Sequence, residues 1–409
     1  IRDRDVSGFD NSLTRYAGLM RATRLHFKGL SYIKIASQFI APIYVPYVFN
    51  IFQDAENRGI KHLYFLSRDG YIFYKIAEIF HPIFENIDLH YLCVSRRSLY
   101  LPGMKEISSE EVKNMFLDPE GVNIADVLDR LQLESDKLKK KFGRYSGVEL
   151  IDNLFKDREF VEQLTIKHKE QRNLCFKYLD QEGLSRGNCA IIDESGTRKC
   201  QIAINRILES GGKAHVFGYY LEALDNRLPG TDYHADFYSD RWKRYLKNNP
   251  LFPHDLFEQY FCITDQFRIG SYKLDRDGQV IPLKEHDTIT DYNKKVSQIN
   301  IKVCQFFAKQ FVKIIPKCIN EVESNALYAY EQFAKNPLKN YLKAFKELSI
   351  SESQIHTSKV FKGNSFLRSL FHNNKTFWRQ AQIVNSSCIS VVINVYYYLK
   401  ELYKREFRY

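Results

Sequence analysis

The chain of 409 residues contains little glycine and little proline, with 19 and 11 residues respectively. These counts argue against a collagen-like or low-complexity protein, and against an all-β protein of short strands joined by tight turns. Hydrophobic residues make up 44% of the chain and include 30 Phe and 27 Tyr. This supply can bury large cores and argues against disorder. The length predicts two or three lobes.

The sequence also lacks the cysteine and histidine spacings of a dedicated metal centre. None of the eight cysteines forms a C-x-x-C pair, and the eleven histidines show neither H-E-x-x-H nor H-x-x-x-H spacing. Several cysteines stand within apolar runs, such as Cys93 in LCV and Cys189 in NCAII. We therefore expect buried, reduced thiols in a cytoplasmic protein, and we predict no residue as a metal ligand.

The positive charge is concentrated at one end of the chain. Residues 359–409 carry +7 of the formal net charge of +11. Such a surplus suits nucleic acid, an anionic membrane surface or a phosphorylated substrate, but no nucleic-acid-binding motif is present. Within this tail, residues 382–399 are apolar yet too polar for a membrane span. They suit peripheral contact with an anionic membrane, or equally a helix packed on the protein with a solvated basic face.

Hydrophobic patterning predicts an α/β fold with helical N- and C-terminal regions. Residues 1–59 have a helical pattern that ends at the stop signal Asn57-Arg58-Gly59. Residues 60–280 alternate short apolar runs, such as His62–Leu66 and Leu89–Val94, with helical stretches, which is typical of a parallel sheet. Residues 105–186 interrupt this alternation with charged amphipathic segments, so we predict a helical insertion there. Residues 281–409 again favour helix.

A polar turn follows each of three predicted strands. Ligands of open α/β sheets bind beyond the carboxyl ends of the strands, so we expect the turns to meet at one edge. Taken singly, each turn is better explained by a capped helix or a solvated loop, whereas the three turns together favour a site. The turns are Ser67-Arg68-Asp69-Gly70, Ser95-Arg96-Arg97 and Asp193-Glu194-Ser195-Gly196-Thr197.

The chemistry of these turns suits a sugar phosphate. The adjacent carboxylates of Asp193 and Glu194 can hold sugar hydroxyls, and the following Ser-Gly-Thr turn can present backbone N–H groups to a phosphate. Arg68 and the Arg96-Arg97 pair offer planar donor groups to a diphosphate. Gly70 permits an unusual backbone conformation at its turn.

These motifs together resemble a known family. The segments FLSRDGYIFYKIAEIF, YLCVSRRSL and AIIDESGT, within roughly residues 30–280, resemble the glycan phosphoribosyltransferases of bacterial surface-polysaccharide (O-antigen and capsule) biosynthesis. The resemblance implies a Rossmannoid sheet like that of type I phosphoribosyltransferases. It also implies transfer of 5-phosphoribofuranosyl from 5-phosphoribosyl 1-diphosphate to a hydroxyl of a glycan acceptor, with release of diphosphate. Here Ser-Gly-Thr follows the acidic pair at once, which is shorter than the usual type I loop.

The resemblance further implies partners, a location and residue roles. The partners are a lipid-linked glycan and a phosphatase of the haloacid dehalogenase type, often fused or paired, which would leave β-ribofuranose. The location is the cytoplasm, at the inner face of the cytoplasmic membrane. Mg²⁺ would bind mainly through the donor's diphosphate and ribose hydroxyls. Donor-binding residues would be Ser67, Arg68, Gly70, Arg96 and Arg97 at the diphosphate, Asp193 and Glu194 at the ribose, and Ser195, Gly196 and Thr197 at the 5-phosphate.

Two residues are candidates for the general base that the acceptor hydroxyl needs. Asp69 belongs to the predicted diphosphate turn, and Glu258 precedes a Gly270-Ser271-Tyr272 segment, as an acidic residue tends to do in the related family. A salt-bridged surface carboxylate explains either residue equally well.

Other classes of protein compete with this interpretation. A nucleotide-sugar-dependent glycosyltransferase would use a similar sheet edge. A non-catalytic, basic, membrane-associated scaffold would depend on residues 359–409 rather than on Asp193. A phosphatase of the haloacid dehalogenase class is disfavoured, because Ser67 or Arg68 stands where its nucleophilic aspartate is needed.

Overall fold

The computed structural model describes most of the chain up to residue 359. Thr197, Glu258 and the basic tail after Lys359, including residues 382–399, lie outside the described residues. The described residues are 11–27, 29, 31–116, 119–196, 198–223, 231–235, 260–285, 289–315, 329–330, 333–334, 337–345, 349–353 and 356–359.

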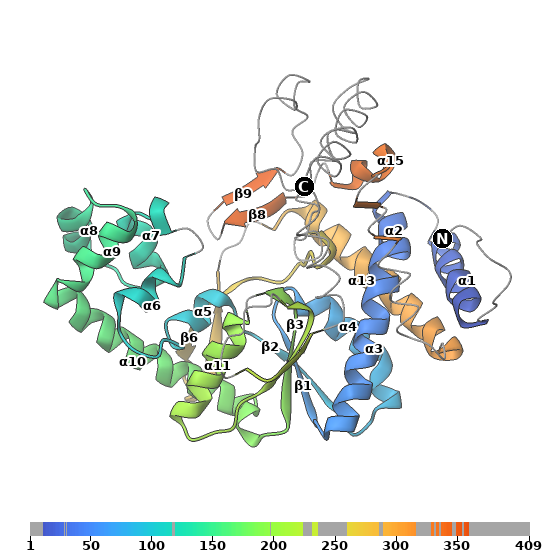
Figure 1. Ribbon diagram of the computed structural model, residues 1–409, viewed down its shortest axis with the longest axis horizontal. Helices are drawn as coiled ribbons and strands as arrows, with labels where there is room; N and C mark the ends of the chain where they lie inside the picture. The colour runs from blue at the N-terminus through green and yellow to red at the C-terminus, as the bar shows by residue number, and fades with distance from the viewer. Residues whose placement is uncertain are drawn as a thin grey trace, which may run out of the picture.

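A five-stranded parallel sheet forms the centre of the protein (Figure 1). The strand order β2-β1-β3-β4-β5 is one of the two common orders of doubly wound sheets, and it confirms the predicted α/β class. The order reverses between the neighbours β1 and β3, which creates a switch point there. The strands are β1 (His62–Leu66), β2 (Asp88–Leu92), β3 (Cys189–Gly196), β4 (Phe217–Ala223) and β5 (Tyr233–Ala235).

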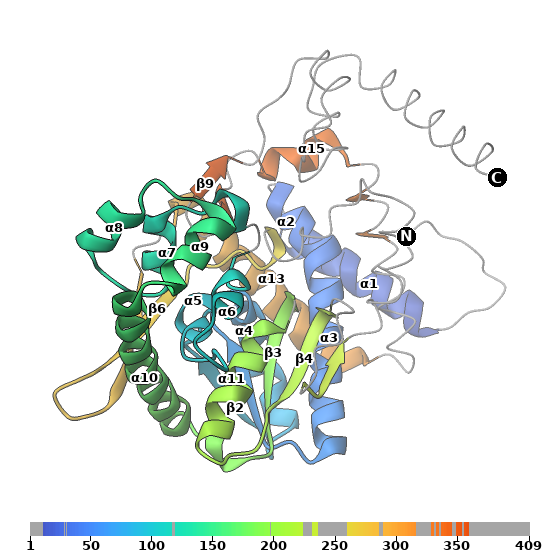
Figure 2. The same cartoon turned by 60° about the vertical axis from the view of Figure 1, so that its left-hand side comes forward.

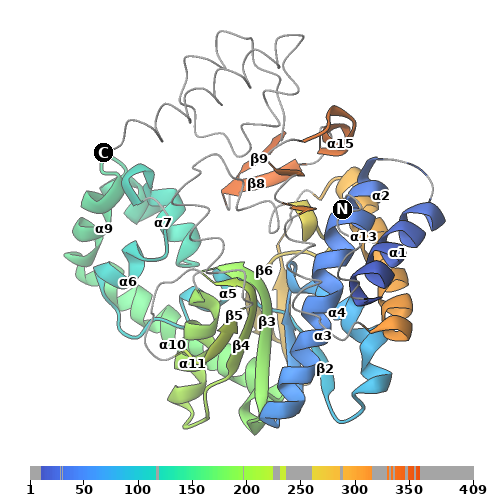
Figure 3. The ribbon, with the colours of Figure 1, turned by 45° about the vertical axis from the view of Figure 1, so that its right-hand side comes forward.

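Helices cover both faces of this sheet (Figure 3). Alternate residues of a strand point to opposite faces. In β1, Leu63 and Phe65 belong to the core shared with α3, α4 and α13, whereas Tyr64 and Leu66 belong to the core shared with α10 and α11. These helices are α3 (Ala41–Arg58), α4 (Gly70–Phe80), α10 (Arg158–Gln181), α11 (Lys199–Ser210) and α13 (Asp291–Ile314).

The N-terminal region is helical, as predicted, and leads into the core helix α3. It comprises α1 (Asn11–His26), α2 (Ser31–Ile35) and a π-helical turn, η1 (Ala36–Ile40). Pro42 is the second residue of α3, directly after η1, so its missing N–H leaves this continuous helical stretch one backbone donor short. Gly59 ends α3 with a left-handed φ of 70°. The stretch Ser31–Arg58 is long and apolar enough to cross a membrane, but 89% of its most apolar window is buried inside the protein.

The predicted helical insertion forms a small lobe with its own core (Figure 2). Side chains of Ser108, Asn123, Ser135 and Asp157 cap its helices by accepting backbone N–H bonds. Its elements before α10 are α6 (Ser109–Lys113), η3 (Pro119–Gly121), α7 (Ile124–Arg130), α8 (Asp136–Phe142) and α9 (Gly147–Phe155).

The core beneath α3 crosses both predicted domain boundaries. It joins residues from Tyr16 to Phe345 into one cluster. The boundary after residue 280 also falls inside β7, within an antiparallel hairpin. The remaining elements are η2 (His81–Ile83), α5 (Arg96–Tyr100), η4 (Leu184–Arg186), β6 (Ile269–Leu274), β7 (Val280–Lys284), α15 (Lys339–Leu342), η6 (Lys343–Phe345), β8 (Ser349–Ser353) and β9 (His356–Lys359).

Candidate functional site

The turn after β1 is tied to the neighbouring strand β2. The backbone N–H of Ser67 donates to the carbonyl of Leu92 at 2.9 Å, and the Ser67 hydroxyl donates to the carbonyl of Val94. Arg68 has a φ of 74°, a left-handed conformation that is costly for a residue with a side chain. Its backbone N–H donates to the Tyr91 hydroxyl at 3.0 Å. The Ser67 hydroxyl therefore has a structural role that sequence reasoning did not foresee.

Gly70 has a different role from the one predicted. Its φ is not left-handed, because Arg68 takes the unusual conformation instead. A Cβ at position 70 would lie 3.3 Å from the carbonyl oxygen of Ile192 and 3.3 Å from the carbonyl carbon of Phe65. Glycine thus lets the start of α4 approach the backbones of β1 and β3, which places the β1 turn directly beside β3.

The predicted Ser-Gly-Thr turn after β3 is wrong for its first two residues. Strand β3 continues through Gly196, and Asp193, Ser195 and Gly196 pair in parallel register with β4. The seven-residue strand β4 provides a partner along this whole stretch, so the backbone stays extended. Helix α11 begins only at Lys199, so a phosphate can meet helical N–H groups there but not at Ser195.

Arg198 is a site residue that sequence reasoning missed. It precedes α11 with a left-handed φ of 56°, and it is only 2% exposed. Its guanidinium carbon lies 4.0 Å from the centre of the Tyr233 ring, a cation–π contact. Arg198 directly follows the predicted phosphate turn, so its sequence position was a usable signal. The chain thus passes through a left-handed arginine after both β1 and β3.

Three carboxylates from these two strand ends lie near enough to the thiol of Cys262 to act on it electrostatically. Burial raises the pKa of Cys262 well above its usual range, and the charges of Glu194, Asp69 and Asp193 raise it further. Asp69 and Asp193 are half-buried, whereas Glu194 is only 1% exposed. The β1 and β3 turns therefore bring their acidic side chains to one place, as the strand-end argument expects.

Helix α3 supplies two tyrosines to this acidic cluster. The Tyr44 hydroxyl lies 3.2 Å from the Cys262 sulfur, and the Tyr47 hydroxyl donates to the carbonyl of Asp193 at 3.3 Å. Burial, followed by the charges of Cys262 and Glu194, raises the pKa of Tyr44 well above its usual range. Sequence reasoning missed both tyrosines because their apolar neighbours are typical of a core helix.

The third turn contributes less to the site than predicted. Ser95 caps α5, since its hydroxyl accepts from the Ser98 N–H at 3.2 Å and donates to the Ile269 carbonyl at 2.5 Å. Arg96 is exposed. Burial of Lys199 lowers the pKa of its ammonium group, and the positive charge of Arg96 lowers it further. Arg96 therefore lies near the start of α11, on the same side as the β3 turn.

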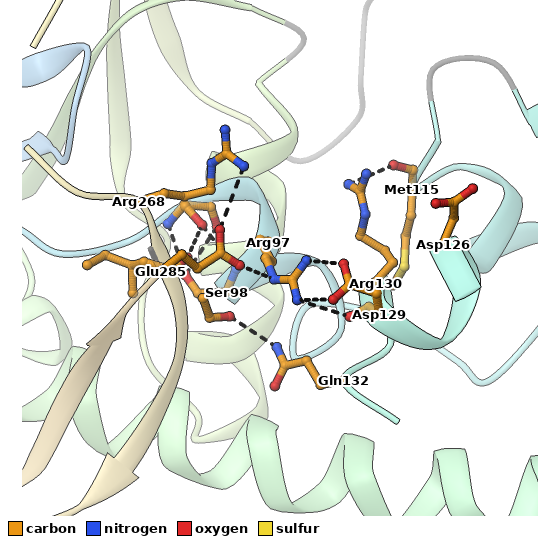
Figure 4. A network of polar contacts seen from close by, with 12 residues as sticks. Arg97, Ser98, Met115, Asp126, Asp129, Arg130, Gln132, Arg268 and Glu285 are labelled. Atoms are coloured by element: carbon orange, nitrogen blue, oxygen red, sulfur yellow. Dashed lines mark hydrogen bonds and ion pairs between the residues drawn. The ribbon is translucent and has the colours of Figure 1, made fainter. Parts of the chain in front are cut away.

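Arg97 is engaged by two carboxylates (Figure 4). Its terminal nitrogens bind Asp129 in a bidentate pair, with Nη2 at 2.7 Å from Oδ1, and its Nε pairs with Glu285. Glu285 also lies 3.7 Å from a guanidinium nitrogen of Arg268. These contacts tie the helical insertion to the end of the β6–β7 hairpin, so they favour a structural role for Arg97 over diphosphate binding.

The strand-end carboxylates form no closed cage for a metal in the part of the chain that the structure describes. Among the described residues, His62, Asp88 and His90 form a group whose ligand atoms all lie within 4.8 Å of one another. This group lies toward the amino-terminal ends of β1 and β2, away from the strand-end carboxylates. An open set of one or two carboxylates fits Mg²⁺, which keeps several waters and binds largely through substrate phosphates. Asp69 and Asp193 are the half-buried members of that set.

Fold and site together define an open, doubly wound α/β protein with acidic and basic side chains at its switch point. Comparison with known proteins finds no matching family model and no significantly similar curated protein.

Proposed function

We propose that this protein is a glycosyltransferase that moves 5-phosphoribofuranosyl from 5-phosphoribosyl 1-diphosphate to a hydroxyl of a glycan, in bacterial surface-polysaccharide biosynthesis. The observation that carries the proposal is the close approach of the β1 turn to β3 at the switch point, where the charges of Asp69, Asp193 and Glu194 all act on the buried Cys262. The phosphoribosyltransferase-like character of the sheet is part of this proposal.

The donor's diphosphate suits the turn after β1. The eleven-residue helix α4 starts there, and its N-terminus carries a partial positive charge. Arg68 adds a guanidinium from a turn whose backbone is held by Tyr91. At the other end of the donor, Arg198, Lys199 and exposed Arg96 near the start of α11 suit the 5-phosphate better than the strand residue Ser195 does.

The ribose lies between these two phosphate positions in the proposal. Half-buried Asp193 can accept hydrogen bonds from ribose hydroxyls, whereas the carboxylate of Glu194 is buried in this structure. The donor's Mg²⁺ would be held mainly by the diphosphate and the ribose hydroxyls, with Asp193 beside it, and would supply positive charge to the leaving diphosphate.

In the proposed reaction, the bond between the anomeric carbon and diphosphate breaks, and a bond to the acceptor oxygen forms from the opposite face. The α-linked donor then gives a β-ribofuranoside. The acceptor's proton goes to Asp69, which stands at the start of α4. Glu258 is the second candidate base and lies outside the described residues. Most of the rate enhancement comes from stabilising the leaving group and positioning the acceptor.

The proposal includes a lipid-linked glycan as acceptor, at the inner face of the cytoplasmic membrane. It also includes a phosphatase of the haloacid dehalogenase type, which removes the 5-phosphate from the product.

The test measures donor binding by calorimetry and diphosphate release with Mg²⁺ and a panel of saccharide acceptors. Asp193→Asn is expected to lower turnover at least about 100-fold. Arg68→Asn retains a residue that tolerates left-handed backbone and removes the guanidinium, so it is expected to weaken donor binding at least about tenfold. The matched control Asp277→Asn changes an exposed aspartate in the β6–β7 turn and is expected to behave as the unaltered protein.

Two outcomes contradict the proposal. One is the absence of both donor binding and diphosphate release with every acceptor. The other is binding and turnover of a nucleotide sugar in preference to phosphoribosyl diphosphate, which would favour a nucleotide-sugar-dependent glycosyltransferase.

A further inference from the structure

A second cluster of polar side chains lies at the opposite end of the sheet, where β1 and β2 begin. His62 is the first residue of β1, and its register partner Asp88 is the first residue of β2. His90 follows Asp88 by two positions, so the two side chains point to the same face, and His62 shares that face through its register with Asp88.

Two of the three distances within this cluster match those of a tetrahedral metal site. The His62 Nδ1 atom lies 3.2 Å from Asp88 Oδ2 and 3.4 Å from His90 Nε2. Bonds of about 2.0–2.1 Å from zinc to nitrogen or oxygen place neighbouring ligand atoms about 3.3–3.4 Å apart in a tetrahedron. All three ligand atoms lie within 4.8 Å of one another.

Hydrogen bonds between these three side chains cannot satisfy all of their facing atoms. The Nδ1 atom of His62 faces both the Asp88 carboxylate and the Nε2 atom of His90. An imidazole nitrogen carries at most one proton, which points well at only one of these two partners. A single cation between the three atoms would satisfy all of them at once.

The surroundings hold the ligands in place and leave the site open. The Tyr64 ring stacks on His90 with ring centres 4.4 Å apart, and the Tyr64 hydroxyl donates to the Glu182 carbonyl at 2.8 Å. The Asp88 side chain is 64% exposed and that of His62 is 22% exposed, so an ion can enter from solvent. A fourth position facing solvent can hold water.

We propose that His62, Asp88 and His90 bind one divalent transition-metal ion, and that Zn²⁺ is the best fit to two imidazoles and one carboxylate. The ion fastens the edge strand β2 to β1, far along the sheet from the proposed transfer site. This inference does not depend on the transferase proposal.

The test titrates the reduced full-length protein with Zn²⁺ by calorimetry and records visible spectra with Co²⁺. We expect one Zn²⁺ per chain and a tetrahedral Co²⁺ spectrum without the near-ultraviolet band of thiolate ligands. His62→Ala and His90→Ala are expected to abolish this binding, and Asp88→Asn is expected to weaken it at least about tenfold. The control His215→Ala removes an exposed histidine just before the start of β4, at the amino-terminal ends of the strands. This variant should bind Zn²⁺ as the unaltered protein does.

Zn²⁺ is also expected to raise the thermal midpoint of the unaltered protein but not that of Asp88→Asn. Because the Asp88 side chain is exposed, Asp88→Asn is the variant to use if a histidine variant does not fold. The proposal is overturned if no stoichiometric ion binds, if Asp88→Asn binds as tightly as the unaltered protein, or if the Co²⁺ spectrum shows thiolate ligands. Diphosphate release should be the same in Asp88→Asn, so failure of this proposal is distinct from failure of the transferase proposal.

Discussion

At the scale of single residues, the turns at the switch point combine strained and closely packed positions. Arg68 and Arg198 both hold left-handed backbone, each at a cost of about 1 kcal/mol or more. Gly70 lies where the backbones of β1 and β3 leave little room for a side chain. The surrounding core must hold this geometry, which is a common condition of binding sites.

Gly70→Ala tests how tightly the β1 turn is packed against β3. The added Cβ would lie 3.3 Å from backbone atoms of Ile192 and Phe65, which cannot move aside as a flexible side chain would. We expect a loss of about 1–3 kcal/mol in the free energy of unfolding, measured by urea denaturation. The control Gly18→Ala adds a Cβ in helix α1 with nothing within 4 Å, so it should stabilise the protein by about 0.5–1 kcal/mol. Equal effects of the two substitutions would contradict this explanation.

At the scale of elements, a tyrosine of α1 replaces a backbone hydrogen bond that a proline removes from helix α3. Pro46 lies inside α3 and has no N–H to donate to the carbonyl of Pro42 four residues earlier. The hydroxyl of the buried Tyr16 donates to that carbonyl instead. The helix is therefore continuous through Pro46.

Tyr16→Phe is expected to lower the free energy of unfolding by about 1–3 kcal/mol, because the buried Pro42 carbonyl loses its donor. The same substitution in a Pro46→Ala background should cost less, since the alanine introduced there supplies a helical N–H to that carbonyl. Urea denaturation of the four proteins of this double-mutant cycle measures the difference. Additive effects would show that the hydroxyl acts elsewhere.

Element positions were largely predictable from local patterns. The apolar run His62–Leu66 matches β1 residue for residue, and the insertion is helical as its amphipathic segments indicate. The predicted run Leu89–Val94 is offset from β2, which begins at Asp88 and ends at Leu92. The end of β3 was mispredicted because Gly196 suggested a turn, whereas pairing with β4 keeps it extended.

At the scale of the whole molecule, Arg97 joins three parts of the chain. It stands on α5 and binds Asp129 of the insertion and Glu285 after the β6–β7 hairpin (Figure 4). A bidentate arginine–carboxylate pair fixes orientation as well as distance. Arg97 therefore holds the insertion lobe against the sheet domain, beside the candidate site.

The pH dependence of stability tests this contact. The hydrogen bond with Arg97 holds the pKa of Asp129 below its usual range. The ionised carboxylate thus favours the folded state, fully so above the ordinary carboxyl pKa of about 4, and this stabilisation is lost as the pH falls through the lowered value. Between pH 5 and about pH 3, the urea midpoint should fall more steeply in the unaltered protein than in Asp129→Asn. Parallel curves would show that the ion pair adds no stability.

By itself, the sequence determined the α/β class, the helical insertion and the residues at the strand ends, because apolar periodicity and turn signals are local properties of the chain. Only the tertiary structure decided the strand order, the extension of β3 along β4 and the pairing of Arg97 with two carboxylates. It also decided the placing of Cys262 and Tyr44 among the acidic side chains and the convergence of His62, Asp88 and His90. These features depend on contacts between residues that are distant in the chain, and no local pattern encodes them.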